Sequence, residues 1–443
     1  MANSEIALLT ATQATAEIAR GALSAEEYTR ACLDQIAAIE NEVQAFTHLD
    51  PEHALSQARA LDERRASGDA LGPLHGVPVA IKDIFDTADY PTECGSPILT
   101  GRRPYRDATA VARLRAAGAV IIGKTVTTEF AYFHPGKTRN PRGLTRTPGG
   151  SSSGSAAAVA AGMVPLAIGS QTNGSMIRPA AFCGVFGVKP SHGLVSCAGA
   201  LTLSRTLDHV GAFARSLEDL ALILDCLVGH DPADPDSRPY ASASFRAGLA
   251  QPLPLPPSFA LVRTPMWDKA DADARSALEE FAEEVGAREV DLPDDYRAAW
   301  DAQRAIMAAD MAFNLGAFVD KGGDISKRFR DLIAEGHKVT APQYLAAVRD
   351  ARRYGERMMG IFEQLSDAII TLSAKGVAPQ GLGATGDPVF CTLWTLTGFP
   401  SLNLPLLANS EGLPIGVQLV GAPGRDERLL RTASALIGNL AGE

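Results

Sequence analysis

Apolar and polar positions along the first third of the chain predict helices and strands in turn. Ser24-Ala25-Glu26-Glu27 forms a capping box, in which the serine and the second glutamate satisfy each other's backbone amides at a helix start. The apolar run 76–81 predicts a buried strand that ends at Lys82. The expected helices cover about 24–40, 51–66 and 108–117, and the expected strands cover 76–82 and 119–122. Because a strand, a helix and a strand follow one another, we expect βαβ units and a largely parallel sheet.

The pattern changes in the middle of the chain. Between 133 and 155 Gly, Pro, Ser, Thr and Arg dominate, and a long loop of this kind inside a compact domain is usually functional or disordered. Residues 231–257 are rich in Pro, Asp and Ser, which predicts a linker or a crossing loop. Further helices are expected at about 155–163, 217–228, 426–436 and through most of 270–364, and further strands at 368–372, 401–406 and 415–419. Strand signals at both ends of the chain therefore predict one sheet with a helical insertion.

Composition narrows the class of protein. The chain has 443 residues and a formal charge of −10, so it lacks the positive charge that broad contacts with nucleic-acid phosphates require. None of its six cysteines is spaced as C-x-x-C, which disfavours a zinc site or a disulfide framework and is typical of a reducing compartment. The sequence also lacks a basic leader and an apolar run long enough to cross a membrane. We therefore expect a soluble, cytoplasmic protein without nucleic-acid or membrane partners.

The first candidate for chemistry is Lys82, which follows the predicted buried strand directly. Partial burial disfavours the charged ammonium and lowers the pKa of a lysine, and a neutral lysine can act as a general base. The alternative is a structural lysine that reaches solvent or pairs with Asp83 or Asp86.

The second candidate is the run from Gly149 to Ser155, which contains four serines. A phosphate-binding P-loop would need lysine where Ser155 stands. A G-x-S-x-G nucleophile elbow would place Ser152 at its centre, but it needs a preceding strand that residues 140–148 cannot form. A flexible linker is the third interpretation.

The third candidate is the turn that contains Gly174 and Ser175. The backbone amides of Thr172, Asn173, Gly174 and Ser175 could converge on one point and form an oxyanion hole. Asn173 tolerates a left-handed backbone better than most residues other than glycine. A polar turn without function explains the same residues.

Taken together and in this order, these runs resemble the amidase signature family. The family's G-G-S-S-[GS]-G-S-A motif matches 149–156, and its lysine motif G-x-P-x-x-[IV]-K matches 76–82. The bacterial malonamidase-like group is most similar, because it shares the G-G-S-S-S-G-S and T-G-D-P variants. Further matches lie at 174–175, 178–184, 187–190, 385–388 and 412–418, so the resemblance extends from about residue 5 to 436. It implies a single large α/β/α domain over 1–443 with a central mixed sheet covered by helices, a catalytic core at about 70–215 and a helical insertion at about 258–365 that shapes the substrate pocket.

The resemblance also implies the site. The family's catalytic triad falls on Lys82, Ser151 and Ser175, with a cis peptide bond between Gly150 and Ser151. Ser175 would attack the substrate carbonyl while its proton passes through Ser151 to neutral Lys82, and the amides of 172–175 would hold the oxyanion. Side chains expected to support the triad or contact substrate are Ser152, Ser170, Gln171 and Arg178. No metal or cofactor is implied.

Three positions depart from the family pattern or have an open role. Gln171 stands where many members have aspartate, and Asn173 where many have glycine, which leaves the pH optimum open. Arg178 is expected to form a structural ion pair, and the alternative is a clamp on a substrate carboxylate, as in the malonamidase-like group.

The expected function is hydrolysis of small amides. Aryl and alkyl amides, carbamates (urethanes) and malonamate-like acids all suit the mechanism, and a homodimer is a candidate assembly. The alternatives are an amidotransferase A-type subunit that supplies ammonia from glutamine in a tRNA-dependent complex, and a non-catalytic binding protein. The pocket walls are expected from 130–135, 300–365 and 376–390. Residues that suggest either an apolar cavity or core packing are Met311, Phe313, Leu382, Phe390 and Trp394.

Overall fold

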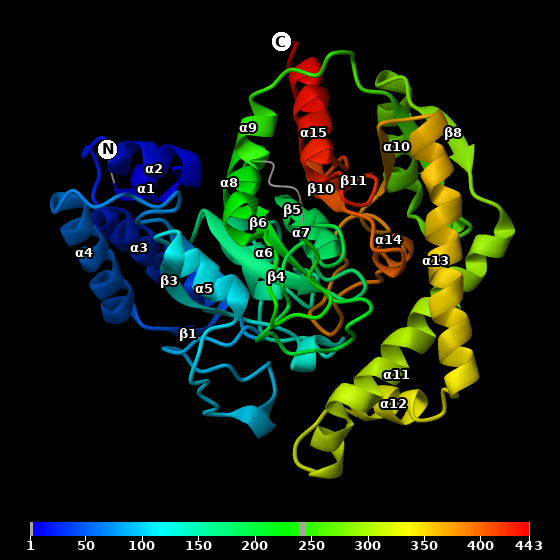
Figure 1. The fold of residues 1–443 in the computed structure, drawn as a ribbon, viewed down its shortest axis with the longest axis horizontal. Coiled ribbons are helices and arrows are strands. Elements are labelled where there is room, and N and C mark those ends of the chain that lie inside the picture. Colours follow the sequence, from blue (N-terminus) through cyan, green and yellow to red (C-terminus); the bar gives the residue numbers. More distant parts are fainter. Residues whose placement is uncertain (1–2, 240–243, 443) are drawn as a thin grey trace.

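A single mixed sheet of eleven strands runs through the computed structural model, which describes residues 3–239 and 244–442 (Figure 1). Met1 and Ala2, at the end where no leader is expected, lie outside the described residues. The strands are β1 Phe46–Leu49, β2 Pro78–Lys82, β3 Val120–Thr125, β4 Leu166–Gln171, β5 Phe186–Lys189, β6 His209–Ala214, β7 Phe259–Arg263, β8 Arg288–Asp291, β9 Ala368–Leu372, β10 Ser401–Ala408 and β11 Pro414–Val420. Their order in the sheet is β1-β3-β2-β4-β6-β5-β10-β11-β9-β7-β8. The expected single sheet built from both ends of the chain is confirmed.

Helices cover this sheet, and their starts follow the local sequence. They are α1 Asn3–Ala7, α2 Ala11–Ala19, α3 Ala25–Val43, α4 Pro51–Ala66, α5 Thr109–Ala116, α6 Ser153–Ala160, α7 Ile177–Cys183, α8 Leu217–Leu227, α9 Phe245–Leu249, α10 Ala272–Glu284, α11 Ala298–Asp320, α12 Lys327–Gly336, α13 Ala341–Gln364, α14 Thr392–Leu396 and α15 Asp426–Ala441. The predicted capping box of α3 is present, since Glu27 donates its amide to the Ser24 hydroxyl at 3.0 Å and accepts from the Ser24 amide at 2.8 Å. None of the described helices combines the length and the apolar character that a membrane span requires.

The expectation of a largely parallel sheet is wrong. Among the described strands four pairs are parallel (β2 with β3, β2 with β4, β7 with β8 and β7 with β9), and the other six pairs are antiparallel. The pattern missed β5 and β6, which are short and contain glycine, a residue depleted in strands. Because β6 lies between β4 and β5 and is antiparallel to both, these missed strands change the character of the sheet.

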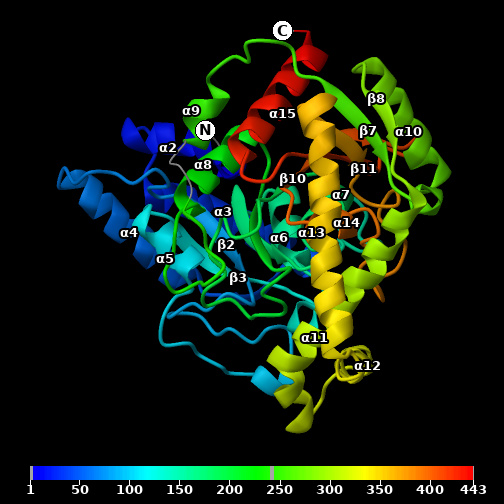
Figure 2. The ribbon, with the colours of Figure 1, turned by 45° about the vertical axis from the view of Figure 1, so that its right-hand side comes forward.

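The insertion at 258–365 is mainly but not wholly helical. β7 and β8 lie inside it and extend one edge of the sheet. Their signal was missed because β8 reads Arg-Glu-Val-Asp, and charged residues of this kind are used on exposed edge strands. The long helices α11 and α13 run side by side along one flank of the molecule, with α12 at the end of the pair (Figures 1 and 2).

The sheet places two functional segments at one edge. β2 is buried along its whole length and pairs in parallel with both β3 and β4. Since the carboxyl ends of neighbouring parallel strands meet at the same edge of a sheet, Lys82 at the end of β2 lies near Gln171 at the end of β4. The residues that follow β4, 172–175, therefore lie above the end of β2.

Candidate active site

Lys82 is completely buried and holds two serine hydroxyls. Its Nζ lies 2.7 Å from Oγ of Ser151 and 2.8 Å from Oγ of Ser170. Burial lowers the pKa of Lys82 to about 7, although the negative charges of Asp208 and Cys94 act in the opposite direction. A large fraction of Lys82 is therefore neutral near pH 7 and can accept a proton from a hydroxyl.

The structural alternative for Lys82, an ion pair with a neighbouring aspartate, is wrong. The Asp83 carboxylate lies 3.2 Å from the buried Nζ of Lys124. Asp86 pairs with Arg102 at 2.7 Å. Both carboxylates thus have other cationic partners.

The serine-rich run is a rigid part of the core. The peptide bond between Gly150 and Ser151 is cis, as the family resemblance implies. Ser152 is completely buried, and its Oγ bonds to both the carbonyl and the amide of Ser170, at 3.2 and 3.3 Å. The interpretation of this run as a flexible linker is therefore wrong. It leads directly into α6, whose first residues are also buried.

Ser175 lies in the turn between β4 and α7, and it is partly exposed. Ser175 and Ser151 line the same cavity. In the described residues the Ser175 hydroxyl makes no hydrogen bond, so Ser151 contacts Lys82 but does not yet contact Ser175. Gln171 fixes the turn at its end, because its Oε1 accepts from the amides of Met176 and Ile177 at 2.8 and 3.0 Å.

The turn 172–175, called the oxyanion turn below, directs its polar groups in two ways. Its carbonyls are held by side chains: Gln303 donates to Thr172 O at 3.2 Å, and Thr395 donates to Asn173 O. Within 3–239 and 244–442 the amides of Asn173, Gly174 and Ser175 have no protein acceptor. Free amides on a turn that lines a cavity are the donors an oxyanion hole requires.

The cavity encloses about 320 Å³ of empty space, a volume that suits a small ligand. All three segments expected to form its walls contribute to it. The expected apolar residues do not, since Met311, Phe390 and Trp394 belong to the core, Phe313 is 89% exposed and Leu382 lies off the lining. The lining residues are Thr128, Ala131, Tyr132, Phe133, Ser151, Thr172, Asn173, Gly174, Ser175, Arg178, Leu203, Met307 and Thr385.

Arg178 is a buried cation in this lining, only 2% exposed. Its Nη2 donates to the carbonyl of Gly150 at 2.6 Å, and its guanidinium lies 5.7 Å from the centre of the Phe133 ring. No described carboxylate lies within ion-pair distance of it, so the expected structural ion pair is wrong. Nε and Nη1 are buried without a hydrogen-bond partner. Burial lowers the pKa of Arg178 to about 10, which still leaves it charged at neutral pH.

Asp208 is a site residue that the sequence did not single out. Its Oδ1 accepts from the Thr172 hydroxyl at 2.6 Å, and its Oδ2 accepts from the amides of Leu203 and Ser204 at 2.9 and 3.0 Å. Burial raises the pKa of Asp208 to about 7. It therefore ties two walls of the cavity together close to Lys82. No motif marks it, because its partners lie in different segments of the chain.

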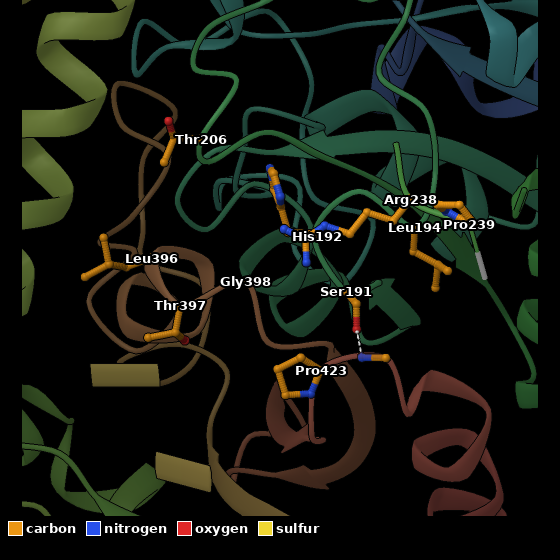
Figure 3. Close-up of a pocket in the computed structure, with 11 residues that line it drawn as sticks. Ser191, His192, Leu194, Thr206, Arg238, Pro239, Leu396, Thr397, Gly398 and Pro423 are labelled. Carbon is orange, nitrogen blue, oxygen red and sulfur yellow. Dashed lines mark hydrogen bonds between the residues drawn. The ribbon is translucent and has the colours of Figure 1, made fainter. Parts of the chain in front are cut away.

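A second, larger cavity lies beside the loop that follows β5 (Figure 3). It contains a serine and a histidine, but they do not form a catalytic pair. The Ser191 hydroxyl donates to Asp426 at 2.6 Å and accepts from the Gly424 amide at 2.8 Å. His192 Nε2 bonds to the carbonyl of Arg205 at 2.9 Å, in keeping with the packing role expected for it. The described residues also contain no group of three potential metal ligands.

Comparison with known proteins identifies the family. The Amidase family model matches residues 27–430. The chain belongs to the amidase signature family. It is similar to the A chain of the glutamyl-tRNA(Gln) amidotransferase of Chloroflexus aurantiacus, at 37% identity over 97% of this chain and 96% of that protein. As a member of this amidase family it is a hydrolase that acts on C–N bonds.

Solved structures of amidase signature proteins have the same fold. One belongs to a vestigial protein complex that reveals the evolutionary origins of an s-triazine catabolic enzyme, with a TM-score of 0.91 and 32% identity over 97% of this chain and 98% of that one. Another is the native peptide amidase of Stenotrophomonas maltophilia, with a TM-score of 0.83 and 31% identity over 97% and 96% of the two chains. The α/β fold with a helix-covered mixed sheet is therefore shared along almost the whole chain.

Proposed function

We propose that Ser175 is the nucleophile of an amidohydrolase that works through an acyl-enzyme. Ser175 Oγ attacks the carbonyl carbon, and its proton passes through Ser151 to neutral Lys82. The amides of the oxyanion turn stabilise the tetrahedral oxygen. The C–N bond then breaks as the proton returns through Ser151 to the leaving nitrogen, and water hydrolyses the ester on Ser175.

The observation that carries this proposal is the buried contact of 2.7 Å between Lys82 Nζ and Ser151 Oγ beside Ser175. Burial gives the lysine a pKa near neutrality, which suits a general base at pH 7. Catalytic hydrogen bonds are often long in a free enzyme, so the Ser151–Ser175 bond is expected to close when substrate binds. Ser151→Ala should therefore also lower kcat, because the proton of Ser175 then has no route to Lys82.

We propose further that the substrate is a small amide with a carboxylate near the scissile bond. Arg178 lines the cavity that contains Ser175, and it is charged and without a carboxylate partner among the described residues. A guanidinium binds a carboxylate through two parallel hydrogen bonds, and Nε and Nη1 are the nitrogens that still have donors to offer. This agrees with the resemblance to the malonamidase-like group. Carbamates and neutral anilides are the competing substrate classes.

Replacing Arg178 by glutamine tests this substrate class. We expect kcat/KM for the half-amide of a dicarboxylic acid to fall about 100-fold more than kcat/KM for a neutral amide of the same size, because only the first loses a charged hydrogen-bond partner. The ratio of the two values is the readout, since Arg178 also holds the carbonyl of Gly150 and its loss can slow both reactions. An equal loss on both substrates would contradict the carboxylate clamp.

An amidotransferase A-type subunit is the second candidate, favoured by the 37% identity to such a protein. The isolated chain should decide between the two functions when it is given anilides, carbamates, half-amides and glutamine. Turnover of small amides by the chain alone supports the amidohydrolase. Activity on glutamine only, and only with a partner protein present, would replace it by the amidotransferase. The native mass of the same preparation tests for a homodimer.

A further inference from the structure

One face of α11 forms a wall of the catalytic cavity. Gln303, Met307, Asp310 and Asn314 recur at intervals of three or four residues, so they share one stripe of the helix. Met307 lines the cavity. Asn314 Nδ2 donates at 3.1 Å to the carbonyl of Leu203, another lining residue. This part of the insertion therefore contacts the site directly.

Gln303 is the member of the stripe that reaches the oxyanion turn. Its side chain is 2% exposed. Nε2 donates to the carbonyl oxygen of Thr172 at 3.2 Å, and Oε1 accepts from Nδ2 of Asn173 at 3.3 Å. The two ends of one amide group thus hold two consecutive residues of the turn.

Asn173 is held by a second element as well. Thr392 Oγ1 of α14 donates to Asn173 Oδ1 at 2.8 Å. Thr395 Oγ1, one turn later on α14, donates to the backbone carbonyl of Asn173. A glycine, which many family members have at this position, could form neither of the side-chain bonds. In this chain the asparagine therefore connects α11 and α14 through the turn.

These bonds fix the direction of the free amides. When the carbonyls of Thr172 and Asn173 are bonded on the side of the helices, the peptide planes that carry the next amides cannot rotate freely. Donors that are oriented before substrate arrives stabilise a developing charge without having to reorganise. A side chain that holds the turn can thus affect the reaction without touching substrate.

We propose that Gln303 is a positioning residue of the oxyanion hole, which holds Thr172 and Asn173 so that the amides of 173–175 face the developing oxyanion. The inference rests on the proposed function, in which this turn stabilises a tetrahedral intermediate. It adds that the helical insertion contributes to transition-state stabilisation through α11.

Gln303→Met tests the proposal, because methionine keeps the length of the side chain but cannot hold either partner. We expect kcat to fall about 10- to 100-fold with little change in KM, since small displacements of catalytic groups have effects of this size. Affinity for a boronic acid analogue of the tetrahedral intermediate should fall by the same factor as kcat/KM. Gln303→Glu restores the acceptor for Asn173 alone and should give a smaller loss.

Arg304→Ala is the matched control on the same helix. Arg304 is exposed and pairs with Glu335 of α12 at 2.5 Å, so its loss perturbs the packing of the insertion without touching the turn. It should leave kcat unchanged, and circular dichroism and thermal melting should show that both variants are folded. The proposal is overturned if Gln303→Met equals this control in kcat and in analogue affinity. It is also overturned if only KM changes, which would indicate a substrate contact.

A double-mutant cycle checks the route of the effect. If Gln303 acts through the turn, Asn173→Gly and Gln303→Met should together cost less than the product of the separate losses in kcat. Independent losses would contradict a shared route. Ser175→Ala separates this inference from the proposed function. If that variant stays active, the proposed function fails, whereas an inactive Ser175→Ala beside a fully active Gln303→Met removes the positioning role alone.

Discussion

Ser175→Ala should lower kcat for any amide the protein hydrolyses by about 10⁴- to 10⁶-fold, the order found when serine nucleophiles are removed. The reason is that no other hydroxyl in the cavity can replace it. Ser151 is hydrogen-bonded to Lys82, and the other serines that support the site are buried behind it. The measurement is steady-state hydrolysis with the most active amide of the substrate panel.

The control for this variant is Ser276→Ala, a serine on α10 away from the cavity. It makes the same chemical change and should leave kcat unaltered. Ser175 is partly exposed and its hydroxyl makes no hydrogen bond in the described chain, so Ser175→Ala should also have an almost unchanged melting temperature. Activity in Ser175→Ala comparable to the control would show that the nucleophile is a different residue.

The second large effect should come from Lys82. The proposed base must be neutral, and burial places the pKa of Lys82 at about 7. kcat/KM should therefore rise tenfold per pH unit below about pH 7 and level off above it, as deprotonation of the base becomes complete. Lys82→Met should lose about 10³-fold or more in kcat, because the relay through Ser151 then has no acceptor. A pH profile that is flat between pH 5 and 9 would contradict a lysine base.

The same shift predicts that Lys82 destabilises the fold. Its pKa is lower in the folded protein than in the unfolded chain, so the unfolded chain binds the extra proton and stability is lost as pH falls from 10.5 towards 7. Between these values the loss amounts to about 5 kcal/mol at most. Lys82→Met should thus be at least as stable as the parent in urea unfolding at neutral pH. An inactive but stable variant would show that the lysine is kept for chemistry.

The local parts of the fold were readable from the sequence. α3 follows from the capping box at Ser24, and β2 follows from an apolar run that ends at Lys82. The elements that were missed are those whose stability comes from tertiary contacts. β8 is a charged edge strand, and β6 is a short, glycine-containing strand that is central to the sheet. Propensity is a weak guide for such segments because their neighbours decide their structure.

The candidate site divides in the same way. Lys82, Ser151 and Ser175 stand in motifs with a fixed order, so resemblance alone could bring them together. Asp208 and Gln303 stand in no motif, and their roles depend on contacts with the oxyanion turn across 36 and 130 residues of chain. The absence of a described carboxylate beside Arg178 is likewise a property of the folded chain. Such contacts require the three-dimensional structure.

Burial explains why these residues work together. Desolvation lowers the pKa of Lys82, raises that of Asp208 and leaves the charge of Arg178 without a described carboxylate partner. Each of these states is unfavourable for the isolated group, and each is useful for a reaction that needs a neutral base and a bound anion. The fold thus supplies by exclusion of water what the side chains would not show in solution.

The identity of the nucleophile is tested most directly by trapping the acyl-enzyme. The protein is acid-quenched during turnover of a slow ester or anilide, digested with protease, and its peptides are weighed by mass spectrometry. We expect one peptide, the one that contains Ser175, to gain the mass of the acyl group, and the gain to be absent from Ser175→Ala. An acyl group on any other residue, or turnover in Ser175→Ala with no adduct at all, would contradict the account.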